Sequence, residues 1–311
     1  MVMERFVVLL LQFLDSFAFL ILAAVGLAVI FGMLGVINLA HGEFITIGAY
    51  GTALSYRAGL PLVLAMIVGV LVTAVFGVIV ERTVIRKLYG RLLDSMVATW
   101  GISLILLQGL LIIFGPSLDS IGTPLGTIEY GAFSYSTYRV LLAGISIAVL
   151  VGLYILFVYT DYGLRARATI SDEDMARSLG VDTDRMYLST FALGSALAGL
   201  TGALYAPTLT IVPGMGSTFL VEAFVLVVVG GTAVIVGTLL AGGFLGGIYA
   251  LFTNLYGTFI GRIALLVTTI VVIRLLPRGM TGLVDSLRDR YYRSDGSMRR
   301  MLLSVFKGES G

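Results

Sequence analysis

Long apolar segments set the first constraint on what this chain can fold into. A helix of about 20 apolar residues crosses a bilayer, and five segments reach or approach that length: 17–40, 60–80, 97–114, 138–159 and 187–206. Of all residues 58% are apolar and 12% are charged, whereas soluble domains carry about 25% charge. The sequence therefore predicts an all-α polytopic membrane protein.

Two further apolar stretches do not read as simple spans. The block 219–276 is interrupted by glycines and is long enough for three tight spans, or for two spans and a re-entrant piece. Residues 44–56 are too few to cross a bilayer and predict a short, broken or re-entrant helix. We expect about eight transmembrane helices with broken or re-entrant segments.

The basic residues predict the orientation. Lys and Arg gather in loops 81–95 and 161–186 and in the tail after Pro277, whereas loops 115–137 and 207–218 contain neither. Basic loops stay on the cytoplasmic side, so we expect the C-terminus there and the two uncharged loops outside. The side of the N-terminus depends on whether 44–56 crosses. Loop 115–137 is expected to form an ordered cap or short hairpin.

The expected domain organisation is simple. Residues 1–284 form one transmembrane domain that includes the segment 161–186, and 285–311 form a cytoplasmic C-terminal tail. The tail contains basic and apolar residues that suit an interfacial helix. An unstructured terminus is the alternative.

Polar residues within the apolar segments are candidates for function. A charge at the centre of a membrane costs about 2.5–3.5 kcal/mol, so such residues usually face a bundle interior or a cavity. The candidates are Asn38, His41, Glu43, Gln108, Glu222 and Arg262. His41, the only histidine, is either a buried ring satisfied by a backbone carbonyl or Glu43, or part of a polar path. Glu222 and Arg262 either pair or reach water separately.

Two clusters of glycine accompany these polar residues. Gly32, Gly35, Gly42 and Gly48 in the first half have counterparts in Gly230, Gly231, Gly237, Gly242, Gly243, Gly246 and Gly247 in the second. Short apolar segments interrupted by glycine in corresponding halves indicate broken helices around a substrate path. Close helix packing through small residues is the alternative.

The segment 161–189, DYGLRARATISDEDMARSLGVDTDRMYLS, predicts a short capped helix. Ser171 is a suitable N-cap, the acids after it favour the positive end of a helix dipole, and Gly180 is a left-handed stop. We expect a helix over 172–179, followed by a membrane helix capped by Asp182 or Asp184. Such a helix rests on its own subunit or on lipid headgroups, or it docks on a cytoplasmic partner.

Several stretches carry a family resemblance. They are the Ala176–Gly180 run ARSLG, GLAVIFGMLGVINLAHGEFITIGAY at 26–50, TFALGSALAGLTGAL at 190–204 and RLLPRGMTGL at 274–283. Together they resemble the permease subunits of ABC importers that serve branched-chain amino acids, urea and short-chain amides. The stretch LYGRLLDSMVATWGISLILLQ at 88–108 looks closest to the urea and amide members, although Leu92 replaces the proline usual there.

The resemblance implies a division of roles within the chain. The polar residues and glycine clusters predict a translocation path that uses Asn38, His41, Gly42, Glu43, Gln108, Gly230 and Gly231. The resemblance implies an ATPase-coupling segment that uses Ser171, Asp172, Glu173, Asp174, Ala176, Arg177, Leu179 and Gly180. No metal site is expected.

The resemblance also implies partners, because the chain has no phosphate-binding loop before either of its lysines, Lys87 and Lys307. ATP and Mg²⁺ are expected on two separate cytoplasmic ATPase subunits, with no cofactor bound by this chain. A homologous second permease or a second copy of the chain, and an external solute-binding protein, complete the expected assembly in the plasma (inner) membrane. No nucleic-acid partner is expected.

Two questions about function stay open at this point. Scarce intramembrane charge favours a neutral solute such as urea, because an amino acid requires groups for both its ammonium and its carboxylate; branched-chain amino acids are the alternative. A self-sufficient channel or secondary transporter is the alternative of a different class, but it needs no capped cytoplasmic helix. An enzyme is disfavoured, since a single histidine and no cysteine leave little catalytic chemistry.

Overall fold

The computed structural model describes residues 2–130, 133–231, 234–277 and 279–282. Over this part of the chain seven helices are long and apolar enough to cross a membrane. They are α1 (Val2–Leu34), α3 (Leu62–Thr83), α4 (Leu92–Phe114), α5 (Thr137–Tyr159), α8 (Thr183–Tyr205), α10 (Val234–Tyr256) and α11 (Thr258–Leu275). The predicted all-α polytopic fold is confirmed, with seven such helices where about eight were expected.

Two further helices are too short to cross the membrane. They are α2 (His41–Arg57) with 17 residues and α9 (Gly216–Gly230) with 15. At 1.5 Å per residue they span about 26 and 23 Å, less than the roughly 30 Å hydrocarbon core. The predicted short helix over 44–56 is therefore confirmed, and the block 219–276 holds one short helix and two spans.

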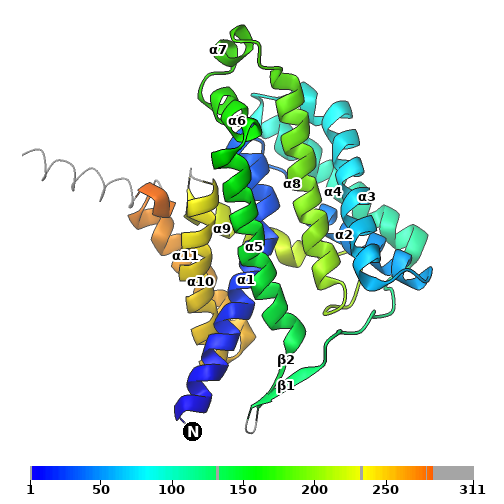
Figure 1. Ribbon diagram of the computed structural model, residues 1–311, viewed down its shortest axis with the longest axis vertical. Coiled ribbons are helices and arrows are strands. Elements are labelled where there is room, and N and C mark those ends of the chain that lie inside the picture. The colour runs from blue at the N-terminus through cyan, green and yellow to red at the C-terminus, as the bar shows by residue number, and fades with distance from the viewer. Residues whose placement is uncertain (1, 131–132, 232–233, 278, 283–311) are drawn as a thin grey trace, which may run out of the picture.

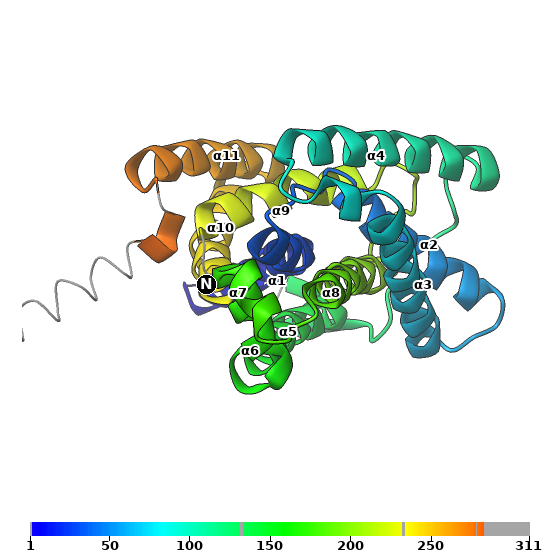
Figure 2. The ribbon, with the colours of Figure 1, turned by 90° about the horizontal axis from the view of Figure 1, so that it is seen from above.

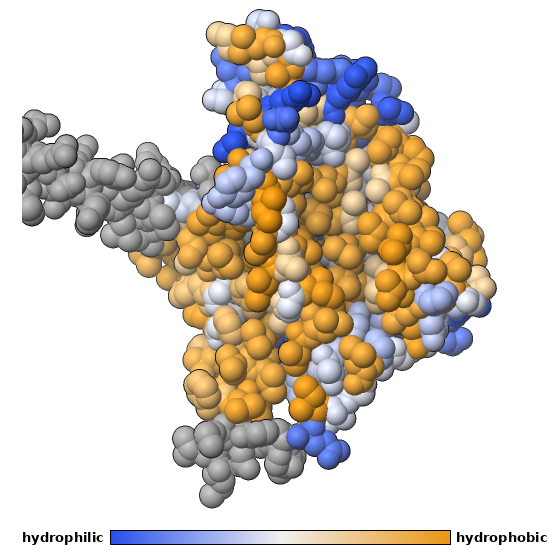
Figure 3. Space-filling model, viewed as in Figure 1, coloured by the Kyte–Doolittle hydropathy of each residue, from blue (hydrophilic) through white to orange (hydrophobic). Residues whose placement is uncertain are grey.

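The bundle has two chemically different ends. At one end, here called the basic end, lie η1 (Ile85–Leu88), α6 (Asp161–Ser171) and α7 (Glu173–Ser178). At the other, the hairpin end, the antiparallel strands β1 (Thr127–Tyr130) and β2 (Phe133–Ser136) form the hairpin expected in loop 115–137 (Figure 1). Hydrophilic residues gather at the basic end around an apolar patch at its tip, and an apolar surface covers the bundle below them (Figure 3).

The expected C-terminal tail, 285–311, lies outside the described residues. The N-terminus of α1 lies at the hairpin end (Figure 1). α1 ends beside Leu88 and Arg91 at the basic end, whereas Arg57 at the end of α2 bonds Asp119 at the hairpin end. The break and the short helix together therefore carry the chain from one end of the bundle to the other.

The two halves of the chain repeat one another in opposite directions. The order of α1 to α4 is a long helix, a short helix and two long helices, and α8 to α11 repeat it. α1 runs toward the basic end, whereas α8 runs toward the hairpin end (Figure 1). α3 packs against α8, and α10 packs against α1. Each half therefore completes the other, the arrangement of inverted-repeat transporters.

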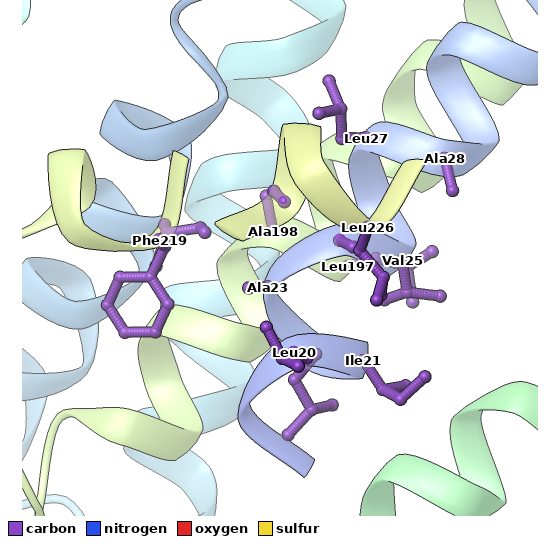
Figure 4. Close-up of a cluster of buried hydrophobic side chains, with 14 of the residues drawn as sticks. Leu20, Ile21, Ala23, Val25, Leu27, Ala28, Leu197, Ala198, Phe219 and Leu226 are labelled. Carbon is purple, nitrogen blue, oxygen red and sulfur yellow. The ribbon is translucent and has the colours of Figure 1, made fainter. Parts of the chain in front are cut away.

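α1 lies at the centre of the bundle, surrounded by α5, α8, α9 and α10 (Figure 2). Apolar residues occupy all of its faces, as expected for a helix buried on every side. Leu20, Ala23 and Leu27 of α1 pack with residues of α8 and α9 (Figure 4). α4, in contrast to α1, is almost fully exposed: only 6% of its apolar stretch is buried within the chain. Its surface therefore suits lipid or another membrane chain.

Glycines allow the backbones of the two halves to touch. A Cβ at Gly26 would lie 2.5 Å from the carbonyl oxygen of Gly194, and Gly48 meets Gly199 as closely. A Cβ at Gly202 would overlap the carbonyl oxygen of Ile45. Small residues commonly allow such close approach between membrane helices.

We expect Gly202→Ala to destabilise the protein, because the added methyl has no space against the rigid backbone of α2. Overpacking of this kind costs about 1–3 kcal/mol or more, so the melting temperature in detergent should fall by several degrees. Gly101→Ala is the control, since nothing lies within 4 Å of a Cβ at that position of α4. Equal melting temperatures for the two variants would contradict the packing assignment.

Candidate functional site

The helix break between α1 and α2 is held by local hydrogen bonds. Gly35, with φ of 63°, ends α1 in the left-handed conformation that glycine tolerates best. The Asn38 side-chain oxygen accepts a hydrogen bond from the Ala40 backbone N–H at 3.0 Å. Thr99 of α4 accepts another from the backbone N–H of Leu39, also at 3.0 Å. The break is therefore a defined structure that α4 completes.

His41 fixes the start of α2 deep in the bundle. Its Nε2 lies 2.9 Å from the carbonyl oxygen of Ala23. A carbonyl oxygen only accepts, so Nε2 carries the proton and donates. Ala23 precedes the end of α1 by about 16 Å of helix at 1.5 Å per residue. Of the two interpretations of His41, the buried ring satisfied by a backbone carbonyl is the arrangement observed.

Glu43 lies in the first turn of α2 and is only 4% exposed. The partial positive charge of a helix N-terminus stabilises a carboxylate at this position. Ser103 of α4 lies beside the Glu43 carboxylate. A second helix of the bundle thus reaches the same short motif.

The N-termini of the two short helices meet at this point. The Gly42 backbone of α2 touches the Gly216 backbone of α9 so closely that neither position has room for a Cβ. The Thr46 hydroxyl donates to the Gly42 carbonyl oxygen at 3.2 Å. Two half-helices whose positive ends meet inside a bundle favour negative groups of a solute there.

Unpartnered polar atoms mark the same region. Asn38 Nδ2, His41 Nδ1 and Glu43 Oε2 are buried and have no hydrogen-bond partner among the described residues. Burying such atoms without a partner costs about 1–3 kcal/mol each. Three of them within six positions indicate a site whose hydrogen bonds are completed by water, a solute or a partner chain.

The remaining path candidates lie elsewhere. Gln108 is exposed on α4, five residues beyond Ser103. Gly230 ends α9 and packs against Gly237 of α10, and Gly231, with φ of 84°, makes the turn between them. Since α9 rises about 1.5 Å per residue, Gly230 lies about 21 Å from the contact at Gly216. Neither glycine is brought to the Asn38–Glu43 motif.

Sequence reasoning missed the residues of other helices that complete the motif, Thr99, Ser103 and Gly216. A hydroxyl in an apolar helix is common, so neither Thr99 nor Ser103 is conspicuous in the sequence. The sequence does contain a signal for Gly216: like Gly42, it lies just before an apolar run that follows a loop.

Glu222 and Arg262 form an ion pair that joins α9 to α11. Arg262 donates to Glu222 Oε1 from Nε at 2.8 Å and from the terminal nitrogen at 2.5 Å. The Glu222 side chain is 7% exposed. The pairing alternative is therefore the observed one, and it anchors the second short helix. No group of three acidic, His or Cys side chains in the described residues could hold a metal ion.

The coupling segment folds into two short helices, α6 and α7. The expected N-cap, Ser171, is wrong by one position: Ser171 ends α6, and Asp172 caps α7 by accepting from the Met175 N–H at 2.9 Å. Asp caps helices as well as Ser does, and its extended backbone separates the two helices. Ser171 and Asp174 were also expected to form a capping box, but with Asp172 as the cap Asp174 no longer occupies that position.

The C-terminal end of α7 matches the prediction. Gly180 has φ of 87°, and its N–H donates to the Arg177 carbonyl oxygen while that of Val181 donates to Ala176. These two bonds form the Schellman motif. Asp182 then caps α8 through the Arg185 N–H at 3.0 Å, which was one of two expected caps.

One face of α7 is tied to its own subunit. Arg177 donates to Glu173 and to Thr183 of α8, each at 2.8 Å. The Tyr187 hydroxyl donates to Glu173 at 2.9 Å. Ala176, 2% exposed, fills the contact. Glu173 and Arg177 therefore hold α7 against α8, and their charged groups are already hydrogen-bonded within the subunit.

A second set of contacts continues from α8 toward α3. The ring of Tyr187 lies 4.8 Å from that of Tyr89, whose hydroxyl donates to Glu81 at 2.7 Å. Burial, and then the hydrogen bond to the Glu81 carboxylate, raise the pKa of the Tyr89 hydroxyl. Tyr89 therefore remains a neutral donor, and α7 is connected to α3 through side chains.

The other face of α7 is apolar and open. Met175 is 58% exposed and Leu179 is 77% exposed at the basic end. Asp172 and Asp174 lie at the start of the same helix. An apolar knob beside acidic residues, projecting beyond the bundle, has the chemistry of a docking element.

Comparison with known proteins agrees with the family resemblance of the sequence motifs. The family described as branched-chain amino acid transport system, permease component, matches residues 9–276. The high-affinity branched-chain amino acid transport system permease protein BraD of Pseudomonas aeruginosa is 28% identical over 84% of this chain and 91% of its own length. The corresponding protein LivH of Escherichia coli is 29% identical over 84% and 90%.

A second type of permease matches less completely. The protein LivM of Salmonella typhimurium, named for the same kind of system, is 30% identical over 67% of this chain and 55% of its own length. No solved structure matches the chain. The resemblance noted in the motifs thus extends over nearly all of the described residues, while the leaning toward urea-type members is not confirmed.

The chain therefore belongs to the family of branched-chain amino acid transport system permease components, as the multi-pass membrane permease subunit of an ABC importer.

Proposed function

We propose that this permease subunit conducts branched-chain amino acids, and that its path passes the meeting point of α2 and α9. The observation that carries the path is the group of buried, unpartnered atoms on Asn38, His41 and Glu43 beside the Gly42–Gly216 contact. Those atoms offer donors and acceptors to a solute where two helix N-termini meet.

The orientation follows from the distribution of basic residues. The basic end carries the loops rich in Lys and Arg, so it faces the cytoplasm, and the hairpin end faces outward. The N-terminus of α1 then lies outside, and α11 ends at the cytoplasmic side. Alternating access would rock one inverted half against the other about the fixed contact of the short helices.

Coupling to ATP is assigned to α7. Met175 and Leu179 are exposed on the cytoplasmic side of this orientation, where each of two ATPase subunits would offer a groove. ATP and Mg²⁺ belong to those subunits, and this chain binds no cofactor. A second permease subunit, which is a second copy or a homologue of the LivM type, and an external binding protein complete the assembly.

The substrate is proposed from the relatives and from charge. BraD and LivH are named for branched-chain amino acid transport. Scarce intramembrane charge favoured urea, but the folded chain pairs acidic and basic side chains at Glu222–Arg262 and Asp15–Arg139. Groups for an ammonium and a carboxylate are therefore present.

The substrate test is uptake by the complete transporter in proteoliposomes. We expect ATP-dependent accumulation of leucine, isoleucine and valine, and no accumulation of urea. Uptake of urea without leucine would overturn the proposed substrate. Transport by this chain alone, without ATP or ATPase subunits, would instead indicate a self-sufficient channel.

Asn38→Leu should lower leucine uptake by about tenfold, since removing one hydrogen-bonding group costs about 1–3 kcal/mol and 1.4 kcal/mol is a factor of ten. Asn254→Leu is the matched control, because Asn254 bonds Gln12 at an exposed position. ATPase subunits should co-purify with both variants. Normal uptake by Asn38→Leu would show that the Asn38–Glu43 motif has only a structural role.

Leu179→Arg and Met175→Arg should prevent co-purification of the ATPase subunits and abolish uptake, because a charge replaces the exposed apolar contact of α7. Ile128→Arg, an equivalent change at a half-exposed residue of the hairpin end, should retain the ATPases. Glu173 is less suitable for this test because it bonds within its own subunit. Retention of the ATPases by both α7 variants would place docking elsewhere.

A further inference from the structure

A small recess opens at the hairpin end between α1, α5, α10 and the turn after α8. Its volume is about 150 Å³, and its walls include Asp15, Phe19, Arg139, Leu142, Tyr205 and Leu209. A cavity of about that size in a protein core holds a benzene molecule. This recess is open on one side, so a somewhat longer molecule fits with one end at the mouth.

Two opposite charges lie together in the recess. Arg139 of α5 donates to Asp15 of α1 at 2.6 Å. The Asp15 side chain is 25% exposed and that of Arg139 is 46% exposed. Each keeps part of its surface free, so a carboxylate oxygen and guanidinium N–H groups remain available to a second pair of charges.

Tyr205 supplies an independent sign of a ligand. The residue is 5% exposed, and its buried hydroxyl has no hydrogen-bond partner among the described residues. The neighbouring hydroxyls are satisfied: Tyr138 donates to the Leu204 carbonyl oxygen at 2.7 Å and Thr208 to that of Tyr205 at 3.0 Å. A phenol left alone in a polar recess is expected to bond a molecule that enters it.

The recess also has an apolar part, beside the remaining wall residues Ser16, Thr208 and Tyr249. Phe19, Leu142 and Leu209 line it, and the Phe19 ring packs edge-on against Tyr205 at 5.7 Å. An aliphatic group placed there loses contact with water, which is favourable. The recess thus combines one acid, one base, one free hydroxyl and an aliphatic surface.

We propose that this recess binds a zwitterionic aliphatic α-amino acid. Asp15 accepts from its ammonium group, Arg139 and the Tyr205 hydroxyl donate to its carboxylate, and the apolar wall takes its side chain. This assignment rests on the proposed transport of branched-chain amino acids, and it names a binding site distinct from the Asn38–Glu43 motif.

The position of the recess suits an entry site. Asp15 precedes Ala23, the partner of His41, by eight residues of α1, which is about 12 Å along the helix. The recess lies on the hairpin side of that point. A solute arriving from outside would therefore meet the recess before it meets the short helices.

The test is binding of radiolabelled L-leucine to the purified full chain in detergent, with competing compounds. We expect 4-methylpentanoate, which lacks the ammonium, and 3-methylbutylamine, which lacks the carboxylate, to compete at least about tenfold more weakly than leucine, because each loses a charged hydrogen-bonding group. Urea should not compete. Equal competition by leucine and either single-charge compound would overturn the proposal.

Variants locate the site. Tyr205→Phe removes one oxygen and should weaken leucine binding by about tenfold, while Arg139→Gln should weaken it further. Arg57→Gln is the matched control, since Arg57 forms an ion pair with Asp119 at the same end, at 3.2 Å, outside the recess. Melting temperatures of the variants show whether they are folded. Wild-type affinity in both recess variants would show that leucine binds elsewhere.

The two proposals fail in different ways. Leucine uptake by the wild-type transporter reports on the proposed function alone. If the transporter accumulates leucine while the purified chain does not bind it, the recess is excluded and the function stands. If the transporter carries urea and not leucine, the proposed substrate is wrong and the amino-acid site is overturned with it.

Discussion

A polypeptide that breaks its helix inside a membrane must satisfy the freed backbone groups within the protein. Each unsatisfied group in lipid costs several kcal/mol, and residues 35–40 break α1 from α2. Asn38 and Thr99 take two of the exposed N–H groups, and His41 secures the returning helix to Ala23. α4 contacts the break through Thr99, and α8 and α9 pack against both α1 and α2, so these helices enclose it.

The helices that enclose the break also connect it to the basic end of the bundle. α3 packs along both α2 and α8. At its basic end, Glu81 reaches α7 through Tyr89, Tyr187 and Glu173. This is a contiguous set of hydrogen bonds and ring contacts, so a displacement of α7 would also move the helices that hold α2. Packed cores transmit such displacements because they have little free volume.

Hydrophobic length and turn chemistry were enough to predict most of the fold. Apolar segments located the spans, and Gly180 predicted the end of α7, because both effects are local. The N-cap moved from Ser171 to Asp172 because two adjacent residues compete equally well for one role. Gly230 and Gly231 lie away from the Asn38–Glu43 motif, which the sequence did not show: a glycine in a sequence does not reveal which backbone it will touch, and Gly216 makes the contact with Gly42.

The substrate argument shows the same limit in electrostatic terms. A count of charges along the apolar segments favoured a neutral solute, and it gave no weight to Asp15 and Arg139, which are 124 residues apart. Folding places them 2.6 Å apart beside an unpartnered phenol. Paired charges cost less to hold in a membrane protein than isolated ones, so a chain with few charged residues can still offer both poles that a zwitterion requires. The chemistry available to a solute depends on which charges meet, and their number alone does not determine it.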